Sequence, residues 1–206
     1  METVQGLLTI ALAFWVVTVS PGPANIAVSA VSLQFGRQSG MRFGAGLAVG
    51  LAVWGAVAAT GMGAVLQSSA QALFVLKIVG GGYLLWLAWT SARSAARPRT
   101  GVDTRVSPSR LFRRGLLLNL SNPKAVFAWM AALSMGLGTE NSAGALVLAT
   151  VICCALGFVN YTGHALIFSH PRAMSIYARL GRWIDGVVAG LFAVGGLSLI
   201  RSALSR

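Results

Sequence analysis

The chain has 206 residues, of which 56% are hydrophobic and 10% are charged, and its mean hydropathy is +0.74. A soluble domain carries about a quarter charged residues, so this composition argues against a soluble enzyme, a disordered chain or a disulfide scaffold. The net charge of +12 would suggest a nucleic-acid partner in a soluble protein, but the charges are confined to gaps between long apolar runs. We therefore predict an integral membrane protein that binds the lipid bilayer and no nucleic acid.

Six apolar segments are long enough to cross a membrane as helices. A hydrocarbon core of about 30 Å needs about 20 apolar residues in helical conformation. The segments are too long and too continuously apolar for the alternating strands of a membrane β-barrel. The predicted fold class is all-α, a polytopic protein with six transmembrane helices. We place these helices at residues 4–24, 43–66, 74–92, 115–137, 143–168 and 184–201.

Arginine and lysine are distributed unevenly between the two sides of these spans. Twelve of them lie in the gaps after the first, third and fifth spans, whereas only Lys77, Arg201 and Arg206 lie on the opposite side. Loops rich in Lys and Arg stay in the cytoplasm. We therefore predict cytoplasmic basic loops and two periplasmic termini.

A basic linker divides the spans into two groups of three. The expected organisation is a first half at 1–92, a cytoplasmic linker at 93–114 with seven arginines, and a second half at 115–206. An odd number of spans in each half means that the second half enters the membrane from the opposite side. This topology predicts an inverted repeat, and the linker charge is expected to fix topology and contact anionic lipid.

The first span is interrupted by Pro21, Gly22 and Pro23. Proline removes a backbone donor and disfavours helix in the residue before it, so this motif is expected to open the helix. A break inside a membrane needs protein or a water-filled cavity to satisfy the freed groups, and transporters use such breaks for binding. Amides near Asn25 could face a carboxylate, and carbonyls before the break could face an ammonium. The alternative is a simple proline kink.

A second interruption lies 100 residues further along, at Asn122 and Pro123, and Lys124 follows it. A lysine near the middle of a membrane is costly unless it is paired, hydrated or able to reach the surface. We expect Lys124 to face the interior and bind a carboxylate of the substrate, Asp185, or the amides of Asn119 and Asn122. The alternative is that it extends to the cytoplasmic surface.

The fifth and sixth spans hold the remaining candidates. Cys153, Gly157, Asn160 and His164 share one helix face and could line a pathway, with His164 exchanging protons. The alternative is close helix packing joined by one interhelical hydrogen bond. Asp185 could belong to the pathway or cap the sixth helix.

The two broken motifs and the third span resemble the LysE/RhtB family of amino-acid exporters. The resemblance rests on Pro21 to Asn25, on Leu76 to Leu85, and on Phe112 to Gly115 followed by Asn119 to Lys124. It implies a bacterial inner-membrane exporter that uses the proton motive force and can form a homodimer. The residues that the resemblance assigns to the substrate pathway are Pro21, Gly22, Pro23, Asn25, Asn122, Pro123 and Lys124.

Charge narrows the expected substrate. A cationic amino acid would need a carboxylate within the membrane, and the spans offer only Asp185. We therefore expect neutral amino acids of the leucine, threonine or homoserine kind. The alternative is another small solute, such as a cationic amino acid, a toxic metabolite or a metal ion. The spans contain no carboxylate pair, no histidine cluster with metal-ligand spacing and no Ser–His–Asp set, so we expect no enzyme activity, no metal and no cofactor.

Overall fold

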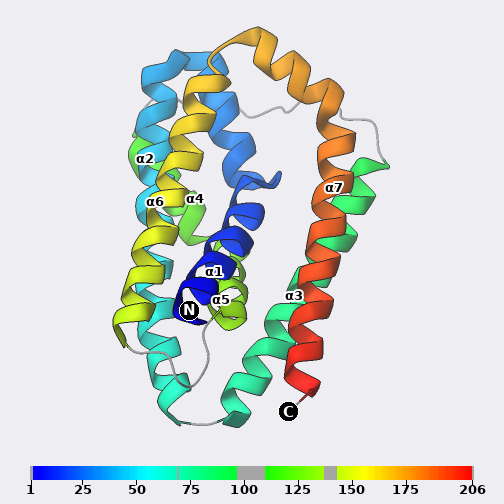
Figure 1. The fold of residues 1–206 in the computed structure, drawn as a ribbon. Coiled ribbons are helices and arrows are strands. Elements are labelled where there is room, and N and C mark those ends of the chain that lie inside the picture. Colours follow the sequence, from blue (N-terminus) through cyan, green and yellow to red (C-terminus); the bar gives the residue numbers. More distant parts are fainter. Residues whose placement is uncertain (1, 69, 97–109, 137–142, 206) are drawn as a thin grey trace.

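The computed structural model describes residues 2–68, 70–96, 110–136 and 143–205, and the secondary structure within them is helical (Figure 1). This agrees with the predicted all-α class. The helices are α1 (Glu2–Val19), α2 (Pro23–Ser68), α3 (Ala70–Ala95), α4 (Leu111–Leu120), α5 (Pro123–Gly136), α6 (Ala143–Ile167) and α7 (Pro171–Leu204).

Three of the described helices are long and apolar enough to cross a membrane. They contain the segments Pro23–Gly61, Ala143–Ile167 and Arg179–Leu204. Two shorter apolar helices, Val4–Val19 and Pro123–Leu133, adjoin the two predicted breaks. Most of the predicted linker, residues 97–109, lies outside the described residues, and its described flanks belong to the ends of α3 and α4.

The predicted first span, 4–24, is wrong at its end. Helix α1 stops at Val19, and α2 begins at Pro23 and runs through the segment that was expected to be a loop. The change of direction comes at Gly36, whose φ of 79° and ψ of 172° favour glycine. The uncharged stretch up to Gly36 therefore forms two helical segments separated by the Pro21–Pro23 break. The predicted span was placed by counting about 20 residues from the first apolar position. This count does not allow for the extra residues of a span that is broken in the middle.

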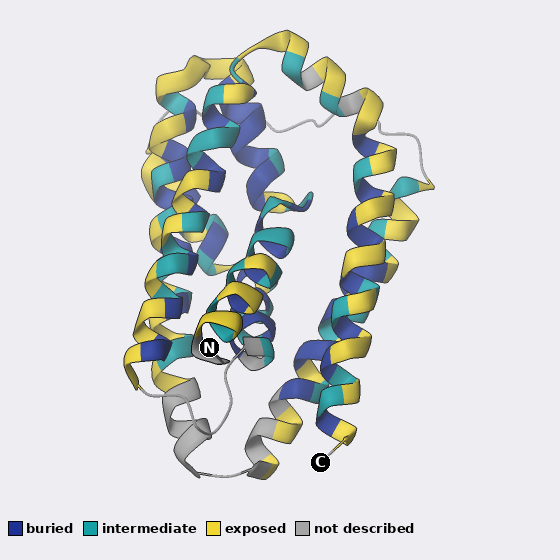
Figure 2. Ribbon diagram, in the orientation of Figure 1, coloured by how far each residue is buried: buried dark blue, intermediate teal, exposed yellow. Residues whose placement is uncertain are grey.

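The helices pack in a pattern that joins the two halves of the chain. Helix α1 packs against α5 and α6, α2 against α4 and α6, and α3 against α7 and α5. In Figure 1, α3 and α7 lie side by side, and α1 and α5 lie between this pair and the group of α2, α4 and α6. Figure 2 shows that the outward faces of α6 and α7 are largely exposed. These faces expose many large apolar side chains, which suits contact with lipid, and α7 also exposes arginines toward its two ends.

Buried aromatic side chains fill the centre of this arrangement. The rings of Phe14 on α1 and Trp129 on α5 have centroids 4.5 Å apart, and neither side chain is exposed. The indole Nε1 of Trp129 donates to the carbonyl oxygen of Leu51 on α2 at 2.9 Å. Helices α1, α2 and α5 are therefore held together where the two breaks occur.

Helices α2 and α4 cross at two glycines. A Cβ added to Gly46 would clash with the carbonyl oxygen of Phe112, and a Cβ added to Gly115 would clash with the carbonyl oxygen of Phe43. The two contacts are reciprocal, so each backbone lies directly on the other. Small residues allow this approach between membrane helices.

We expect Gly46→Ala and Gly115→Ala to destabilise the protein, because each added methyl group meets backbone that cannot move aside. Overpacking of this kind costs about 1–3 kcal/mol. The measurement is the thermal unfolding temperature of the purified protein in detergent. Gly82→Ala is the matched control, because nothing lies within 4 Å of its added Cβ. Equal unfolding temperatures for all three variants would contradict the close crossing.

Candidate functional site

The break between α1 and α2 releases several backbone carbonyl oxygens from helical hydrogen bonding. Pro21 and Pro23 lack the N–H groups that would bond to the carbonyls of the preceding turn. The hydroxyl of Ser20 donates to the carbonyl oxygen of Val17 at 2.6 Å and so replaces one missing donor. Regular bonding resumes where the Ile26 amide donates to the carbonyl oxygen of Gly22 at 2.9 Å.

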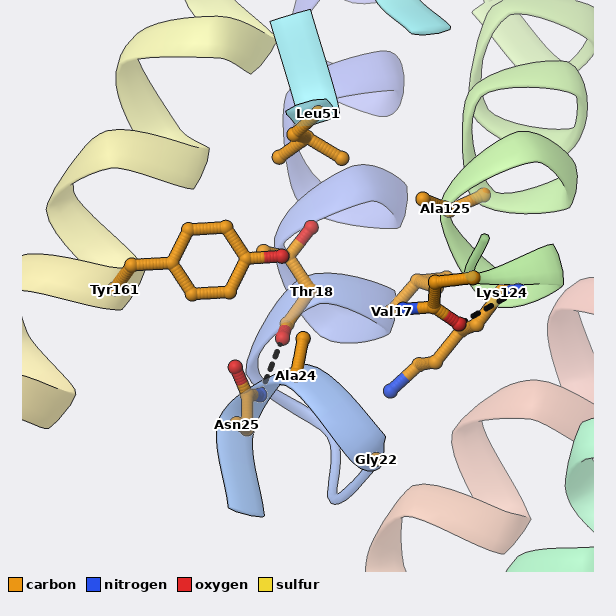
Figure 3. Close-up of a pocket in the computed structure, with 11 residues that line it drawn as sticks. Val17, Thr18, Gly22, Ala24, Asn25, Leu51, Lys124, Ala125 and Tyr161 are labelled. Carbon is orange, nitrogen blue, oxygen red and sulfur yellow. Dashed lines mark hydrogen bonds between the residues drawn. The ribbon is translucent and has the colours of Figure 1, made fainter. Parts of the chain in front are cut away.

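Asn25 supplies donors for two further carbonyls of the break. Its Nδ2 atom donates to the carbonyl oxygen of Thr18 at 2.7 Å and to that of Ser20 at 3.0 Å. The Asn25 side chain is buried, and it curls back over the break from the first turn of α2. Figure 3 shows this side chain and its bond to Thr18. Asn25, which the resemblance assigns to the substrate pathway, thus supplies hydrogen bonds to the break itself.

Lys124 reaches the same break from α5. Its Nζ atom donates to the carbonyl oxygen of Ser20 at 2.8 Å, to that of Pro21 at 3.3 Å, and to the Ser20 hydroxyl. Among the described residues these are the only acceptors of its ammonium. The expectation that Asp185 or the amides of Asn119 and Asn122 hold the ammonium is wrong. Backbone oxygens at the break between α1 and α2 hold the ammonium instead. The residue types in the sequence do not reveal such backbone acceptors.

Gly22 leaves room for the lysine stem. A Cβ added to Gly22 would lie 3.0 Å from Nζ and 3.2 Å from Cδ of Lys124. The glycine between the two prolines therefore has a packing role that the sequence does not show. It lets the side chain of α5 pass close to the backbone of the break.

The backbone groups at the second break are satisfied partly by its own residues and partly by α2. The side chain of Asn122 accepts a hydrogen bond from the amide of Lys124 at 3.1 Å and so caps the start of α5. The amide of Asn122 donates to the carbonyl oxygen of Asn119 at 3.2 Å. The indole of Trp54 on α2 donates to the carbonyl oxygen of Leu120 at 3.2 Å. Pro123 begins α5, where its missing N–H costs little.

A chain of polar contacts connects the second break to α6. Asn119 is fully buried, and its Nδ2 atom donates to the carbonyl oxygen of Leu47 at 2.6 Å and to the Tyr161 hydroxyl at 3.1 Å. The side chain of Asn122 donates to Oδ1 of Asn119 at 3.3 Å. Tyr161 thereby presents its hydroxyl toward Thr18 at the first break (Figure 3).

The face of α6 that holds Asn160 packs against the first break. Asn160 donates to Oδ1 of Asn25 at 2.9 Å, and its own buried Oδ1 accepts no bond from a described residue. Gly157 lies against Leu51, and Cys153 is fully buried. The Nδ1 atom of His164 lies 2.9 Å from the carbonyl oxygen of Asn160, which is one turn earlier in the same helix.

A cavity of about 20 Å³ lies between the two breaks (Figure 3). A single water molecule needs roughly 10–15 Å³ by this kind of measure, so an amino acid enters only if the helices move apart. Of the described residues that line the cavity, none carries a carboxylate. The lining residues are Val17, Thr18, Gly22, Ala24, Asn25, Leu51, Asn122, Lys124, Ala125, Ala128 and Tyr161.

Asp185 lies elsewhere in the fold. It is almost fully buried in α7, and one of its carboxylate oxygens accepts a hydrogen bond from Ser94 of α3 at 2.7 Å. The expectation that Asp185 could cap the sixth helix is wrong, because α7 begins at Pro171 and Asp185 lies well inside it. Nor does Asp185 line the cavity between the breaks. Among the described residues, no group of three Asp, Glu, His or Cys side chains could hold a metal ion.

Comparison with known proteins gives a family and named relatives. The LysE type translocator family matches residues 15–203. A threonine efflux protein of Escherichia coli K12 is 33% identical over 95% of this chain and 97% of its own length. A threonine efflux protein of Salmonella typhi is 31% identical over 94% of this chain and 97% of its own length. A membrane protein of Escherichia coli named YahN is 29% identical over 97% of this chain. No solved structure gives a match.

We expect Asn25→Ala to destabilise the protein, because it removes two donors from carbonyls that are buried at the break. Buried groups left without partners cost about 1–3 kcal/mol. The measurement is again the unfolding temperature in detergent. Ser121→Ala is the control, because the exposed Ser121 hydroxyl donates only to the carbonyl oxygen of Leu117 within its own turn. An Asn25→Ala variant as stable as Ser121→Ala would show that water replaces the amide.

Proposed function

This chain belongs to the LysE type translocator family, and we propose that it exports small neutral amino acids across the bacterial inner membrane. Translocators of this family and the threonine efflux proteins are transporters, so the chain is a transporter and not an enzyme. The proposed substrates are of the threonine, homoserine or leucine kind. We propose the proton motive force as the energy source and a homodimer as the assembly. Both proposals rest on the family resemblance alone.

The observation that carries the proposal is the meeting of two helix breaks at one polar cavity. The cavity is lined by the amide side chains of Asn25 and Asn122 and by Lys124. The Lys124 ammonium in turn bonds to the carbonyls of Ser20 and Pro21. Carbonyls suit an ammonium, whereas a lysine and the amides at the start of a helix suit a carboxylate. A zwitterion matches both. The spare buried acceptor of Asn160 adds a partner for a bound N–H or O–H group beside Asn25.

The preference for neutral amino acids follows from the lining of the cavity. A second positive charge on the substrate would need a carboxylate, and the described lining has none. Asp185 is engaged with Ser94 between α3 and α7. An uncharged side chain can instead contact the apolar part of the lining, which includes Val17, Leu51 and Ala128.

We also propose that the two halves form an inverted repeat, with halves at 1–92 and 115–206 and a cytoplasmic linker at 93–114. Helix pairing supports this, because α1 packs on α5, α2 on α6 and α3 on α7. Each pair joins corresponding spans of the two proposed halves, which is compatible with a pseudo-two-fold axis in the membrane plane. Since the cavity is too small for an amino acid, transport requires the two halves to rock about the crossing of the breaks.

The proposed topology of six spans places both termini in the periplasm. In Figure 1 both termini lie toward one end of the molecule, whereas the bend in α2 and the α6–α7 connection lie at the other. Alkaline phosphatase fused after Arg206 is therefore expected to be active, since this enzyme folds only outside the cytoplasm. The same fusion after Gly101 serves as the control and is expected to be inactive. The opposite pattern would contradict the proposed orientation.

The transport test uses cells that overproduce the protein and are loaded with dipeptides, which raise the internal pools of single amino acids. We expect faster release of a neutral amino acid than from empty cells, and loss of this difference when the proton gradient is collapsed. Lys124→Met should reduce release, because it removes the ammonium from the site. Arg201→Met is the matched control, because this exposed residue in the last turn of α7 does not line the cavity.

Release must be compared at equal amounts of protein in the membrane. Normal export by Lys124→Met would remove Lys124 from the mechanism. If no amino acid leaves faster than from empty cells, the proposed substrate class is wrong, and other small metabolites and metal ions are tested next.

A further inference from the structure

The ammonium of Lys124 lies in a complete set of acceptors. A lysine ammonium has three N–H groups and no acceptor. In this protein three oxygens surround it: the carbonyl oxygens of Ser20 and Pro21 and the hydroxyl oxygen of Ser20. We call these three oxygens the Ser20–Pro21 cradle. Its geometry is that of a binding site for a primary ammonium.

The cradle and its occupant belong to different parts of the fold. The three oxygens are fixed in the break between α1 and α2, where the chain leaves helical geometry and the carbonyls of Ser20 and Pro21 have no helical amide as a partner. The ammonium arrives from α5 on a flexible stem of four methylene groups. The stem passes beside Gly22, where no side chain blocks its movement. The ammonium can therefore leave the cradle without any change in the backbone that forms it.

We propose that the Ser20–Pro21 cradle is the subsite for the ammonium of the substrate, and that Lys124 fills it only while the transporter is empty. This inference rests on the proposed function. When an amino acid enters, its ammonium replaces that of Lys124 in the cradle. The released Lys124 side chain then turns to the carboxylate of the same substrate. Lys124 thus acts as a tethered stand-in for the ligand.

The exchange conserves both hydrogen bonds and charge. The cradle accepts N–H donors before and after it, so no buried carbonyl loses its partner. The loaded site holds two ammonium groups and one carboxylate, and its net charge equals that of the lone Lys124 ammonium. Without the carboxylate, two cations would share one desolvated site at short range. A neutral amino acid therefore fits the exchange better than a cationic one.

The titratable groups near Lys124 do not supply an alternative occupant. Among the described residues, Tyr161 lines the same cavity and accepts a hydrogen bond from Asn119. His164 interacts with Lys124 only through its charge and lies against the carbonyl oxygen of Asn160. Neither donates to the cradle in this structure. The described lining residues from α1, α2 and α5 other than Lys124 carry no ionisable side chain.

The exchange predicts that a vacated cradle binds a free alkylammonium ion. The test uses Lys124→Ala purified in detergent, with ethylammonium chloride or tetramethylammonium chloride at equal ionic strength. Tetramethylammonium has the same charge but no N–H group, so it cannot bond to the three oxygens. We expect ethylammonium to raise the unfolding temperature of Lys124→Ala in a saturable manner, and tetramethylammonium to leave it unchanged.

Two controls separate the cradle from general effects of salt. The wild-type protein should unfold at the same temperature in both salts, because Lys124 already fills the cradle. Arg201→Ala, which loses one positive charge away from the cavity, should behave like the wild type. An identical unfolding temperature of Lys124→Ala in both salts would overturn the proposal. If Lys124→Ala can be purified in folded form only when ethylammonium is present, the result would support the proposal. If it cannot be purified in folded form in either salt, the result would count against the proposal.

A second measurement uses the wild-type protein in inside-out membrane vesicles that take up labelled threonine. N-methylthreonine keeps the carboxylate and an ammonium with N–H groups, whereas N,N,N-trimethylthreonine keeps both charges but has no N–H group for the cradle. We expect N-methylthreonine to compete and N,N,N-trimethylthreonine not to compete; equal competition by the two would overturn the proposal. If no amino acid moves at all, the proposed function fails, while the ethylammonium test still decides whether the cradle binds an ammonium.

Discussion

A carbonyl oxygen that proline releases inside a membrane must find a donor within the protein, because lipid offers none. At the first break these donors are Ser20, Asn25 and Lys124, and the last of them comes from the other half of the chain. The contact of α5 with α1, the missing side chain at Gly22 and the polar cavity are all arranged around this need. The free carbonyl oxygens that would destabilise a broken helix are therefore also the groups that the proposed site uses for binding.

The two breaks are similar in sequence but differ in how they are stabilised. Asn122 caps the helix that follows the second break, and Trp54 covers the carbonyl oxygen of Leu120. The first break has local donors in Ser20 and Asn25, but it also draws on the ammonium of Lys124 from α5. Of the two breaks, the first thus accepts an ammonium from a distant helix. The proposed ammonium subsite therefore needs no ionisable side chain at that break.

The sequence predicted the features that depend on residue type within a short segment. Proline chemistry located both breaks, and the cost of a mid-membrane charge singled out Lys124 as an inward-facing residue. The partner of Lys124 could not be predicted, because the carbonyls of Ser20 and Pro21 carry no side-chain signal and lie more than 100 residues away. The continuation of helix to Gly36 and the position of Asp185 inside α7 were missed for a related reason. Span counting assumes one unbroken helix of standard length. The lengths of these helices depend instead on packing against residues that are distant in the sequence.

The long separation between the cradle and Lys124 also bears on how the protein is made. Residues 20 and 21 leave the ribosome and reach the membrane well before residue 124 has been synthesised. During that interval the carbonyl of Pro21 lacks its Lys124 donor and the carbonyl of Ser20 keeps only Asn25. The hydrogen bonding of the break between α1 and α2 is therefore complete only when α5 has been made and has packed against α1.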